Sequence, residues 1–435
     1  MIESSLLRKK AEKMLSAISW TKYIFGWDIL PRITELLSNT HQEKIKHLAL
    51  ITNLHRRDKE TYLHLLSYVQ KIIPEVSGPF PPVRPNAPLE DVLQLAATLK
   101  KVAPEAVLVA SGGSGIDGAK ASLVLASLEG EIENYFGLGK VSQLLSSQKV
   151  SFPPLFALQT AAGSAAHLTK YSNITNWSLR QKKLIIDEAI IPRGAMFDYS
   201  LTTTMPPSLT LDGALDGLSH CLEVYLGARE NPDFSSLETI CLTGIELVLL
   251  ALPQAIISPD NKEARLLLGL ATDLGGYAIM LGGTNAGHLS SFALVDILPH
   301  GRACGLLNPY FLIPFSLAIP RQLKKLAEVL AKYKLIASYP GKIDPPSLAY
   351  VIAQGLQYFY QQVGFPQSFK EIPGYTSAHL ERLLEMVANP QLRSKLQNMP
   401  LPLTSETAHK LFTEVFQAAE KGDLSRLRPL PLTAS

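Results

Sequence analysis

Two patterns of apolar residues divide the sequence near residue 200. From about Tyr23 to Tyr199, short apolar runs alternate with amphipathic segments, a pattern typical of βα units on a mostly parallel sheet. The pattern predicts buried strands at 47–52, 106–110 and 155–159, helices at 59–73 and 89–102, and a non-helical proline-rich connector at 79–88. We therefore expect residues 1–200 to form an α/β domain.

After about Leu201 the apolar positions recur every three to four residues, in long segments broken by Gly and Pro. This periodicity predicts helices at 209–226, 234–254, 262–282, 303–316, 321–333, 345–363, 376–388 and 405–420. We therefore expect an all-α domain over residues 201–420, followed by a loosely ordered tail at 421–435.

The N-terminal residues and the composition restrict the class and the location of the protein. Residues 1–20 carry charges where a signal peptide needs an apolar core, so they predict a short amphipathic helix, and no uninterrupted apolar run reaches the roughly 18 residues of a membrane span. The chain has 435 residues, 46% of them hydrophobic and 18% charged, which suits a soluble two-domain enzyme. A net charge of +3 without a basic stripe argues against nucleic acid as a partner. The cysteines are too few and scattered for a disulfide framework or a CxxC zinc site, so we expect a reducing, cytoplasmic location.

The segment Leu215–Tyr225 (LDGLSHCLEVY) contains the first candidate metal ligands. Asp216 and His220 are four residues apart in a predicted helix, so their side chains leave the same face. A carboxylate oxygen and an imidazole nitrogen directed at one point suit a divalent metal ion. The same spacing also occurs in surface ion pairs and capping contacts, so the pair alone leaves both interpretations open.

A glycine-rich loop, Ser111–Lys120 (SGGSGIDGAK), follows the predicted strand at 106–110 and leads into helix-like sequence. Backbone N–H groups and the helix dipole would converge there on an anion such as a pyrophosphate, which makes Gly112, Gly113 and Ser114 candidate contacts. A plain tight turn is the alternative. The loop lacks the Walker GK[ST] ending, so it does not indicate a nucleoside triphosphate site.

A second loop of small and hydroxylated residues, Thr160–Thr169 (TAAGSAAHLT), follows the predicted strand at 155–159. Such residues let a ligand approach the backbone closely, so Thr160, Ser164 and Thr169 are candidates for the other side of the same cofactor. An ordinary turn stabilised by Ser and Thr is the alternative.

Two further histidines, His288 and His300, lie in the segment NAGHLSSFALVDILPHG among small neighbours that leave room for a metal and a substrate. Together with Asp216 and His220 they would supply one carboxylate and three imidazoles, a full set for Fe²⁺ or Zn²⁺ with substrate as an added ligand. A lone histidine is more often a satisfied polar residue, so the four-ligand site stays a hypothesis at this point.

These motifs resemble those of the iron-containing alcohol dehydrogenase family over nearly the full length of the chain. The family's glycine motif GGGSxxDxAK is similar to SGGSGIDGAK at 111–120, and its metal helix DALxHAxExY is similar to DGLSHCLEVY at 216–225. The family's proline connector looks like Pro85–Leu89, and its strand-to-domain junction looks like Lys182–Pro192 with Asp198. Its last two metal ligands look like His288 and the His300 of Pro299–Gly301.

The resemblance implies a dehydroquinate synthase-like fold. An N-terminal Rossmann-like parallel-sheet domain would bind NAD or NADP, and a C-terminal helical domain would hold Fe²⁺ or Zn²⁺ on Asp216, His220, His288 and His300, with the active site in the cleft between them. A hydride would pass between a small alcohol or aldehyde and nicotinamide C4, while the metal stabilises charge on the substrate oxygen. The family's habit predicts a homo-oligomer, at least a dimer.

The resemblance also gives roles to residues near the cofactor. The pyrophosphate would lie on Gly112–Ser114 and the nicotinamide over Thr160–Thr169. Asp117 would cap the helix that follows the glycine loop, and Lys182 would reach a ribose hydroxyl or phosphate.

Two departures from the family pattern bear on the substrate. His167 stands where the family's TxxGTGSE loop has Glu, and Phe292 stands where a further histidine is common. All four ligands remain, so we expect substrate preference to depend on these two positions. Phe292 should make the pocket more apolar and favour aldehydes over hydroxy acids.

The run Ile51–Arg57 (ITNLHRR) bears on the choice of cofactor. A carboxylate at the end of the second strand commonly accepts hydrogen bonds from the ribose 2′-OH of NAD, whereas basic residues take the 2′-phosphate of NADP. Here Asn53 stands where NAD-specific members often have Asp, and Arg56 and Arg57 follow. We therefore expect NADP or dual use, although paired arginines are often only solvated surface charge.

Three other functions fit parts of the sequence. A dehydroquinate-synthase-like lyase and a glycerol-dehydrogenase-like enzyme share the fold, but the sequence of the metal helix and the set of four ligands argue against both. A non-catalytic metal-holding homologue is the third, and it leaves the intact glycine loop unexplained. The sequence therefore favours a metal-dependent alcohol dehydrogenase or aldehyde reductase.

Overall fold

Two folded units make up the chain, and each is described here by itself. The computed structural model describes residues 2–38, 44–228, 233–337, 341–388 and 393–432. One unit comprises residues 15–205, and the other comprises residues 1–14 together with 206–435. The expected boundary near residue 200 lies close to this division. The N-terminal segment, which was expected in the α/β half, groups instead with the helical half.

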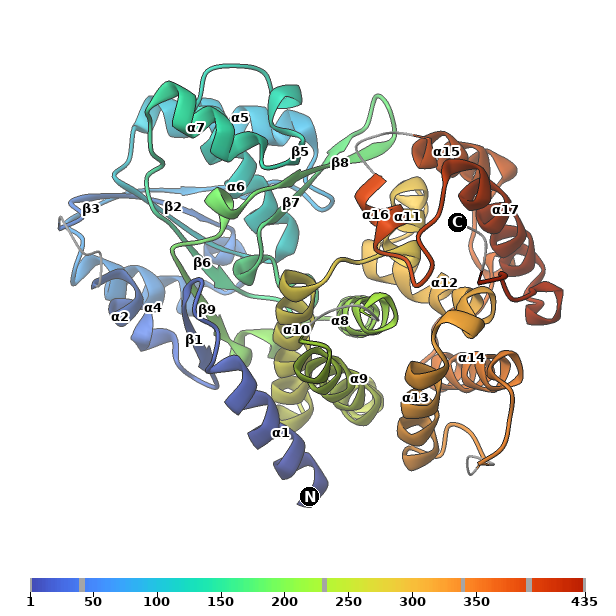
Figure 1. Cartoon of the computed structure of the whole chain (residues 1–435). Helices are drawn as coiled ribbons and strands as arrows, with labels where there is room; N and C mark the ends of the chain where they lie inside the picture. The colour runs from blue at the N-terminus through green and yellow to red at the C-terminus, as the bar shows by residue number, and fades with distance from the viewer. Residues whose placement is uncertain (1, 39–43, 229–232, 338–340, 389–392, 433–435) are drawn as a thin grey trace. The chain divides into compact units, whose positions relative to one another are not determined.

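The α/β unit is built on a six-stranded sheet of order β1-β9-β6-β4-β2-β3, in which every pairing is parallel (Figure 1). Its strands are β1 (Lys22–Gly26), β2 (His47–Thr52), β3 (Glu75–Phe80), β4 (Ala106–Ser111), β6 (Leu155–Gln159) and β9 (Gly194–Asp198). Its helices are α2 (Ile33–Ser38), α3 (Leu54–Arg57), α4 (Lys59–Gln70), α5 (Leu89–Val102), α6 (Gly113–Ser127) and α7 (Lys140–Gln148). The parallel sheet with helices confirms the predicted fold class.

Alternate residues of the central strands enter two separate cores, one on each face of the sheet. Val107 and Val109 of β4 pack with α5 and α6, whereas Leu108 of the same strand packs with α2 and α4. A strand buried on both faces needs apolar side chains in both directions. This is why β2, β4 and β6 are continuous apolar runs and why all three could be predicted from the sequence.

A second, three-stranded sheet of order β5-β8-β7 was not predicted. It contains β5 (Gly137–Leu138), β7 (Tyr171–Asn176) and β8 (Gln181–Ile186), and β7 and β8 form an antiparallel hairpin. These strands are only partly buried and rich in polar residues, so they lack the apolar runs that mark the main sheet.

The second unit is helical throughout its long elements, as the periodicity predicted. It contains α8 (Pro207–Gly227), α9 (Phe234–Ile257), α10 (Lys262–Leu281), α11 (Ala286–Ser291), α12 (His300–Phe315), α13 (Pro320–Lys332), α14 (Pro345–Gln362), α15 (Ser377–Val387), α16 (Arg393–Gln397) and α17 (Ser405–Lys421). Every residue from Thr210 to Leu226 is buried, so α8 is a core helix, packed against α9, α10 and α12 (Figure 1).

Two of these helices, α9 and α10, are long and apolar enough to cross a membrane by length and composition, although the sequence has no uninterrupted apolar run of that length. In their most apolar stretches, 61% and 83% of the residues are buried inside the unit. Such burial is typical of helices in a protein core.

The two ends of the chain pack on the helical unit. The predicted N-terminal helix is α1 (Ile2–Leu15), and its Glu3 forms an ion pair of 2.9 Å with Lys332. The C-terminal segment was expected to be loose, but Leu424 and Leu427 are buried and the Leu430 N–H donates to the Pro314 carbonyl at 2.8 Å. The expectation is therefore wrong for residues 421–432, because Leu424 and Leu427, which precede the two prolines, are buried in the core. Residues 433–435 lie outside the described part of the chain.

Candidate active site

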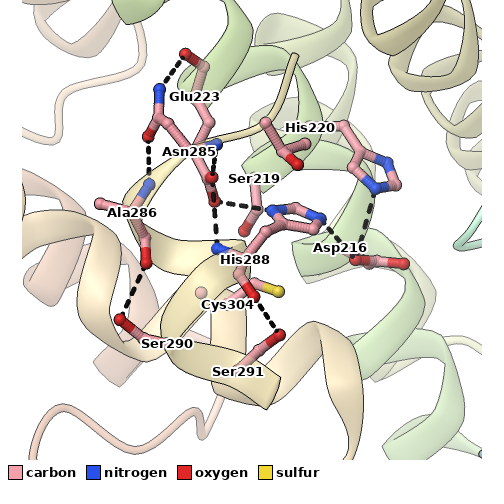
Figure 2. Close-up of polar contacts among 12 residues, drawn as sticks. Asp216, Ser219, His220, Glu223, Asn285, Ala286, His288, Ser290, Ser291 and Cys304 are labelled. Atoms are coloured by element: carbon pink, nitrogen blue, oxygen red, sulfur yellow. Dashed lines mark hydrogen bonds and ion pairs between the residues drawn. The ribbon is translucent and has the colours of Figure 1, made fainter. Parts of the chain in front are cut away.

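Three imidazole nitrogens converge on one carboxylate oxygen in the helical unit. The Asp216 Oδ1 atom lies 3.8 Å from His220 Nε2, 3.7 Å from His288 Nε2 and 3.8 Å from His300 Nε2. Asp216 and His220 lie one turn apart on α8, His288 lies on α11, and His300 is the first residue of α12. Figure 2 shows His220 and His288 directed at Asp216. The structure thus brings together all four residues that the sequence proposed as metal ligands.

Close helix packing makes this convergence possible. A Cβ atom on Gly301 would lie 2.0 Å from the Asp212 carbonyl oxygen and 2.8 Å from the Asp216 Cβ, so only glycine lets the start of α12 approach α8 this closely. Pro299 precedes α12 as its N-cap, and the Asn285 side chain accepts the Ala286 N–H at the start of α11. The residues that begin these two helices therefore position His288 and His300.

Several polar atoms of the cluster are buried without a hydrogen-bond partner among the described residues. They include Asp216 Oδ1 and His288 Nε2, which face each other, although both side chains are about 95% buried. Unpaired polar atoms at such depth cost free energy unless something binds them. Burial also lowers the pKa of His220 to about 4, so its ring is neutral at neutral pH and able to donate a lone pair. One carboxylate and three imidazole rings that converge in this way are donors that fit a divalent metal ion.

Glu223 supports this cluster from one further turn along α8. Its Oε1 atom accepts the Nδ1–H of His288 at 2.8 Å, and its Oε2 atom accepts the backbone N–H groups of Asn285 at 2.8 Å and His288 at 3.3 Å. Burial opposes the charged carboxylate, but the His288 ring and the backbone N–H groups of Asn285 and His288 together lower the pKa of Glu223. A carboxylate on Nδ1 fixes the ring so that the lone pair of Nε2 faces Asp216. The sequence interpretation gave Glu223 no role beyond its place in the motif.

Cys304 is a further member of the cluster that the sequence interpretation missed. Ligand atoms of Asp216, His288, His300 and Cys304 all lie within 4.8 Å of one another, and His220 is not one of these four. The Cys304 Sγ atom is 3.8 Å from His300 Nε2. Figure 2 shows Cys304 near His288. The signal was present in the sequence, because Cys304 follows His300 by four residues.

Phe292 lies beside the cluster, as its departure from the family pattern suggested. Its ring is buried and stacks on the His300 ring at 6.4 Å between centroids. The ammonium group of Lys395, on α16, lies 5.6 Å from the centre of the Phe292 ring and donates to Thr284 Oγ1 at 2.6 Å. Burial lowers the pKa of Lys395. The surroundings of Phe292 are therefore less apolar than the sequence suggested.

The α/β unit places the predicted cofactor residues at the ends of three neighbouring strands. Asn53 follows β2, Gly112 and Gly113 follow β4, and Thr160 follows β6, and these strands lie side by side in the order β6-β4-β2. Because all three are parallel, their carboxyl ends meet at one edge of the sheet, where open α/β sheets bind their ligands. The location agrees with a dinucleotide site.

The two predicted cofactor loops contact each other. A Cβ atom on Gly113 would lie 2.1 Å from Ser164 Oγ, so the glycine is required for the close approach of the two loops. Ser114 Oγ accepts the Asn86 N–H at 3.0 Å, which joins the glycine loop to the proline connector. Gly113 is the first residue of α6, so free N–H groups of the first helical turn are present at this point.

Asp117 does not cap α6, contrary to the expectation. Its carboxylate accepts the backbone N–H of Asn173 at 3.0 Å and the Asn173 amide at 3.2 Å, which joins α6 to β7. The helix begins at Gly113, so Asp117 lies beyond the first turn and cannot reach the free N–H groups. Burial raises the pKa of Asp117, and the charges of Lys120 and of Lys182, on β8, oppose this in part.

Lys120, the last residue of the glycine motif, has a structural role that the sequence interpretation did not assign. It is buried, and its ammonium group donates to the carbonyls of Ala166 and Thr169 at 2.6 Å and of Tyr171 at 2.9 Å. Burial lowers the pKa of Lys120 to about 8. Lys120 therefore fixes the second cofactor loop against α6, and Thr169 takes part through its backbone.

His167 packs in the interior of the α/β unit. Its ring is fully buried between Tyr23, with centroids 5.5 Å apart, and Phe197, with centroids 5.4 Å apart, and its Nε2 lies 3.5 Å from the Tyr23 hydroxyl. This arrangement favours a packing role over the role in substrate preference expected from the sequence.

Comparison with known proteins agrees with this geometry. The family model "Iron-containing alcohol dehydrogenase" matches residues 21–199, and the model "Fe-containing alcohol dehydrogenase family, C-terminal" matches residues 210–415. The chain belongs to the iron-containing alcohol dehydrogenase family.

Individual relatives are similar over parts of their length. The sequence is 32% identical to alcohol dehydrogenase 4 of Saccharomyces cerevisiae over 248 residues, which are 57% of this chain and 62% of the relative. It is 28% identical to the NAD-dependent methanol dehydrogenase of Bacillus methanolicus over 256 residues, which are 58% of this chain and 64% of the relative. The structure is similar to that of an alcohol dehydrogenase from Oenococcus oeni, with a TM-score of 0.77, 22% identity, and coverage of 92% of this chain and 98% of that one. This last similarity supports the fold.

Proposed function

We propose that the protein is a metal-dependent alcohol dehydrogenase or aldehyde reductase, which transfers a hydride reversibly between a small alcohol or aldehyde and NAD(P). The observation that carries the proposal is the convergence of three imidazole Nε2 atoms on Asp216 Oδ1 inside a buried cluster. The names of the yeast and Bacillus relatives support the same reaction class. Neither family model that matches the chain favours a lyase.

The protein's own residues would hold Fe²⁺ or Zn²⁺ through Asp216, His220, His288 and His300. When bound there, the metal supplies a Lewis acid for the oxygen of an alcohol or aldehyde. His288 keeps its Nδ1 proton on Glu223, which leaves Nε2 free to bind. Ser291 Oγ lies 3.1 Å from His300 Nδ1 and donates to the His288 carbonyl at 2.7 Å, so one hydroxyl orients both ligand residues.

We assign cofactor binding in the α/β unit to Gly112, Gly113, Ser114 and Thr160, with further contacts from Asn53, Asp117, Ser164, Thr169 and Lys182. The free N–H groups at the start of α6 suit the pyrophosphate. The three strand ends that meet at this edge suit an extended dinucleotide.

The metal assignment is tested by Asp216→Ala and His220→Ala. Each variant should lose bound metal and turnover together, because each removes one ligand from the cluster. Elemental analysis and alcohol oxidation rates measure the two effects, and wild-type iron-to-zinc content identifies the metal. A variant that keeps wild-type kcat after its metal is removed by a chelator would show that the assignment is wrong.

For the cofactor we propose NADP, or use of both NADP and NAD. Asn53 follows β2 as the N-cap of α3, and Arg56 and Arg57 lie in the same short helix, so no carboxylate stands at this strand end before Asp58. A comparison of kcat/KM for NADPH and NADH tests this, and a strong preference for NADH would contradict it. The similar methanol dehydrogenase is named as NAD-dependent, so a preference for either cofactor is a meaningful outcome of this kinetic comparison.

We further propose a homo-oligomer, at least a dimer, that works in the cytoplasm without nucleic acid or membrane partners. The three cysteines are all free and buried, which suits a reducing compartment. Light scattering in solution measures the oligomeric state.

A further inference from the structure

Two buried lysines of the chain differ in how their charge is satisfied. The ammonium group of Lys120 donates to three backbone carbonyls, so each of its N–H groups has an acceptor. Lys395 is only 8% exposed, and its ammonium group donates to Thr284 Oγ1 and lies over the Phe292 ring. In the part of the chain that the structure describes, Thr284 is its one hydrogen-bond acceptor, so two N–H groups of Lys395 have none.

This arrangement costs free energy unless something else binds the charge. A buried ammonium group that has lost its water needs hydrogen-bond acceptors or an opposite charge. Burial lowers the pKa of Lys395, and the charge of Glu223 opposes this without forming an ion pair among the described residues. The Glu223 oxygens instead accept hydrogen bonds from Asn285 and His288. An anionic oxygen group beside Lys395 would supply the acceptors that the protein does not.

Lys395 lies beside the open side of the metal cluster. The side chain of His300 is 23% exposed, whereas those of the other three proposed ligands are 7% exposed or less. The Phe292 ring stacks on the His300 ring, and the Lys395 ammonium group lies 5.6 Å from the centre of the same Phe292 ring. Burial is the main cause of the low pKa of His220, and the charge of Lys395 adds to it. A substrate that reaches the cluster beside His300 would therefore have Phe292 and Lys395 as its next neighbours.

We propose that Lys395 selects the substrate, and that the preferred substrates are short aldehydes with an anionic oxygen group, such as a carboxylate, at the end away from the reacting carbonyl. The proposal rests on the proposed metal-dependent function and narrows its substrate class. The carbonyl oxygen would lie at the four-ligand cluster, while two N–H groups of Lys395 donate to the anionic group. The corresponding alcohols are hydroxy acids, which the apolar ring of Phe292 alone would disfavour.

The first test measures substrate preference by steady-state kinetics of the metal-loaded wild type. It compares succinic semialdehyde and its sulfonate analogue with butanal, a neutral aldehyde of the same chain length. A hydrogen bond to a charged group should raise kcat/KM for each anionic aldehyde about 10- to 100-fold over that for butanal, mainly through a lower KM. Lys395→Met keeps the length of the side chain without its charge, so this preference should disappear.

Lys332→Met is the matched control for this kinetic test. It removes a lysine charge from the same unit, where the Lys332 ammonium group pairs with Glu3 and Glu246. Neither carboxylate belongs to the metal cluster, so the control should keep the wild-type ratio of kcat/KM between succinic semialdehyde and butanal.

The second test measures binding without turnover. In the absence of NAD(P), γ-hydroxybutanoate should raise the melting temperature of the metal-loaded wild type more than 1-butanol does at the same concentration, because its carboxylate would bind Lys395. The two ligands should have equal effects on Lys395→Met. A larger effect of γ-hydroxybutanoate that Lys395→Met retains would show that the carboxylate binds elsewhere, and would overturn the proposal.

The outcomes separate this proposal from the proposed function. A wild type that reduces butanal as efficiently as the anionic aldehydes, or a preference that Lys395→Met retains, overturns the role of Lys395 and leaves the proposed function in place. A wild type that reduces none of these aldehydes with NADH or NADPH overturns the proposed function, and the binding test then decides the role of Lys395. If Lys395→Met fails to fold, the preference of the wild type decides it.

Discussion

Replacing Glu223 with glutamine tests how the protein orients its metal ligands. The substitution keeps the size of the side chain, and its oxygen can still accept the backbone N–H groups of Asn285 and His288. Its amide NH₂ group then faces His288 Nδ1, which at present donates to the carboxylate at 2.8 Å. Two donors cannot bond, so the ring proton must move to Nε2 and occupy the lone pair that faces Asp216.

The magnitude follows from the bond that is lost. A hydrogen bond to a charged group contributes about 1.5–3 kcal/mol, and about 1.4 kcal/mol corresponds to a tenfold change in affinity. We therefore expect Glu223→Gln to weaken metal binding by about 10- to 100-fold, the range found when groups that orient metal ligands are changed.

Competition with a chromophoric chelator measures this affinity, and thermal unfolding of the metal-free protein measures stability separately. Glu238→Gln is a suitable control, because Glu238 is a partly buried carboxylate on α9 that accepts the Tyr225 hydroxyl at 2.8 Å and does not touch the cluster. Wild-type metal affinity in Glu223→Gln would refute the idea that Glu223 sets the tautomer of His288.

Two further predictions concern stability. Lys120→Met leaves three backbone carbonyls without their donor and should lower the free energy of unfolding by about 3 kcal/mol or more, as measured with urea. The pKa of Lys120 falls from 10.5 to about 8 on folding, so the unfolded chain holds more protons between these pH values. The free energy of unfolding of the wild type should therefore rise relative to that of Lys120→Met by up to about 1.4 kcal/mol per pH unit from pH 8 to 10.5. Equal dependence of the two free energies on pH would contradict this. Gly301→Ala should cost about 1–3 kcal/mol and weaken metal binding, since its Cβ would meet the Asp212 carbonyl; unchanged melting temperature and metal content would contradict it.

The sequence predicted the two kinds of core well. Residues buried on both faces of a parallel sheet form apolar runs, as in β4. A core helix such as α8 keeps its apolar residues at a three-to-four-residue period, although it also buries Asp216, His220 and Glu223. The hairpin of β7 and β8 carries neither pattern, because it is partly exposed and polar. Its absence from the prediction also explains the error at Asp117, whose partner Asn173 lies on β7.

The candidate site was predictable only in part. The i,i+4 spacing on α8 identified Asp216 and His220. His288 and His300 were candidates through their small neighbours, and the resemblance strengthened them, since α11 is too short to show a period. Cys304 was missed because the predicted helix started at residue 303. In the structure α12 begins at His300, which places Cys304 one turn after it.

The burial of α8 also determines how a metal ion can enter and leave. Amide hydrogens on a helix enclosed on all sides exchange only when the whole unit opens, so we expect the backbone at Asp216 and His220 to stay in place whether or not metal is bound. His300 is the exception, with 23% of its side chain exposed, at the first turn of α12 where a helix frays most easily. We therefore expect fraying of that one turn to set the rate of metal exchange, independently of the affinity of the closed site.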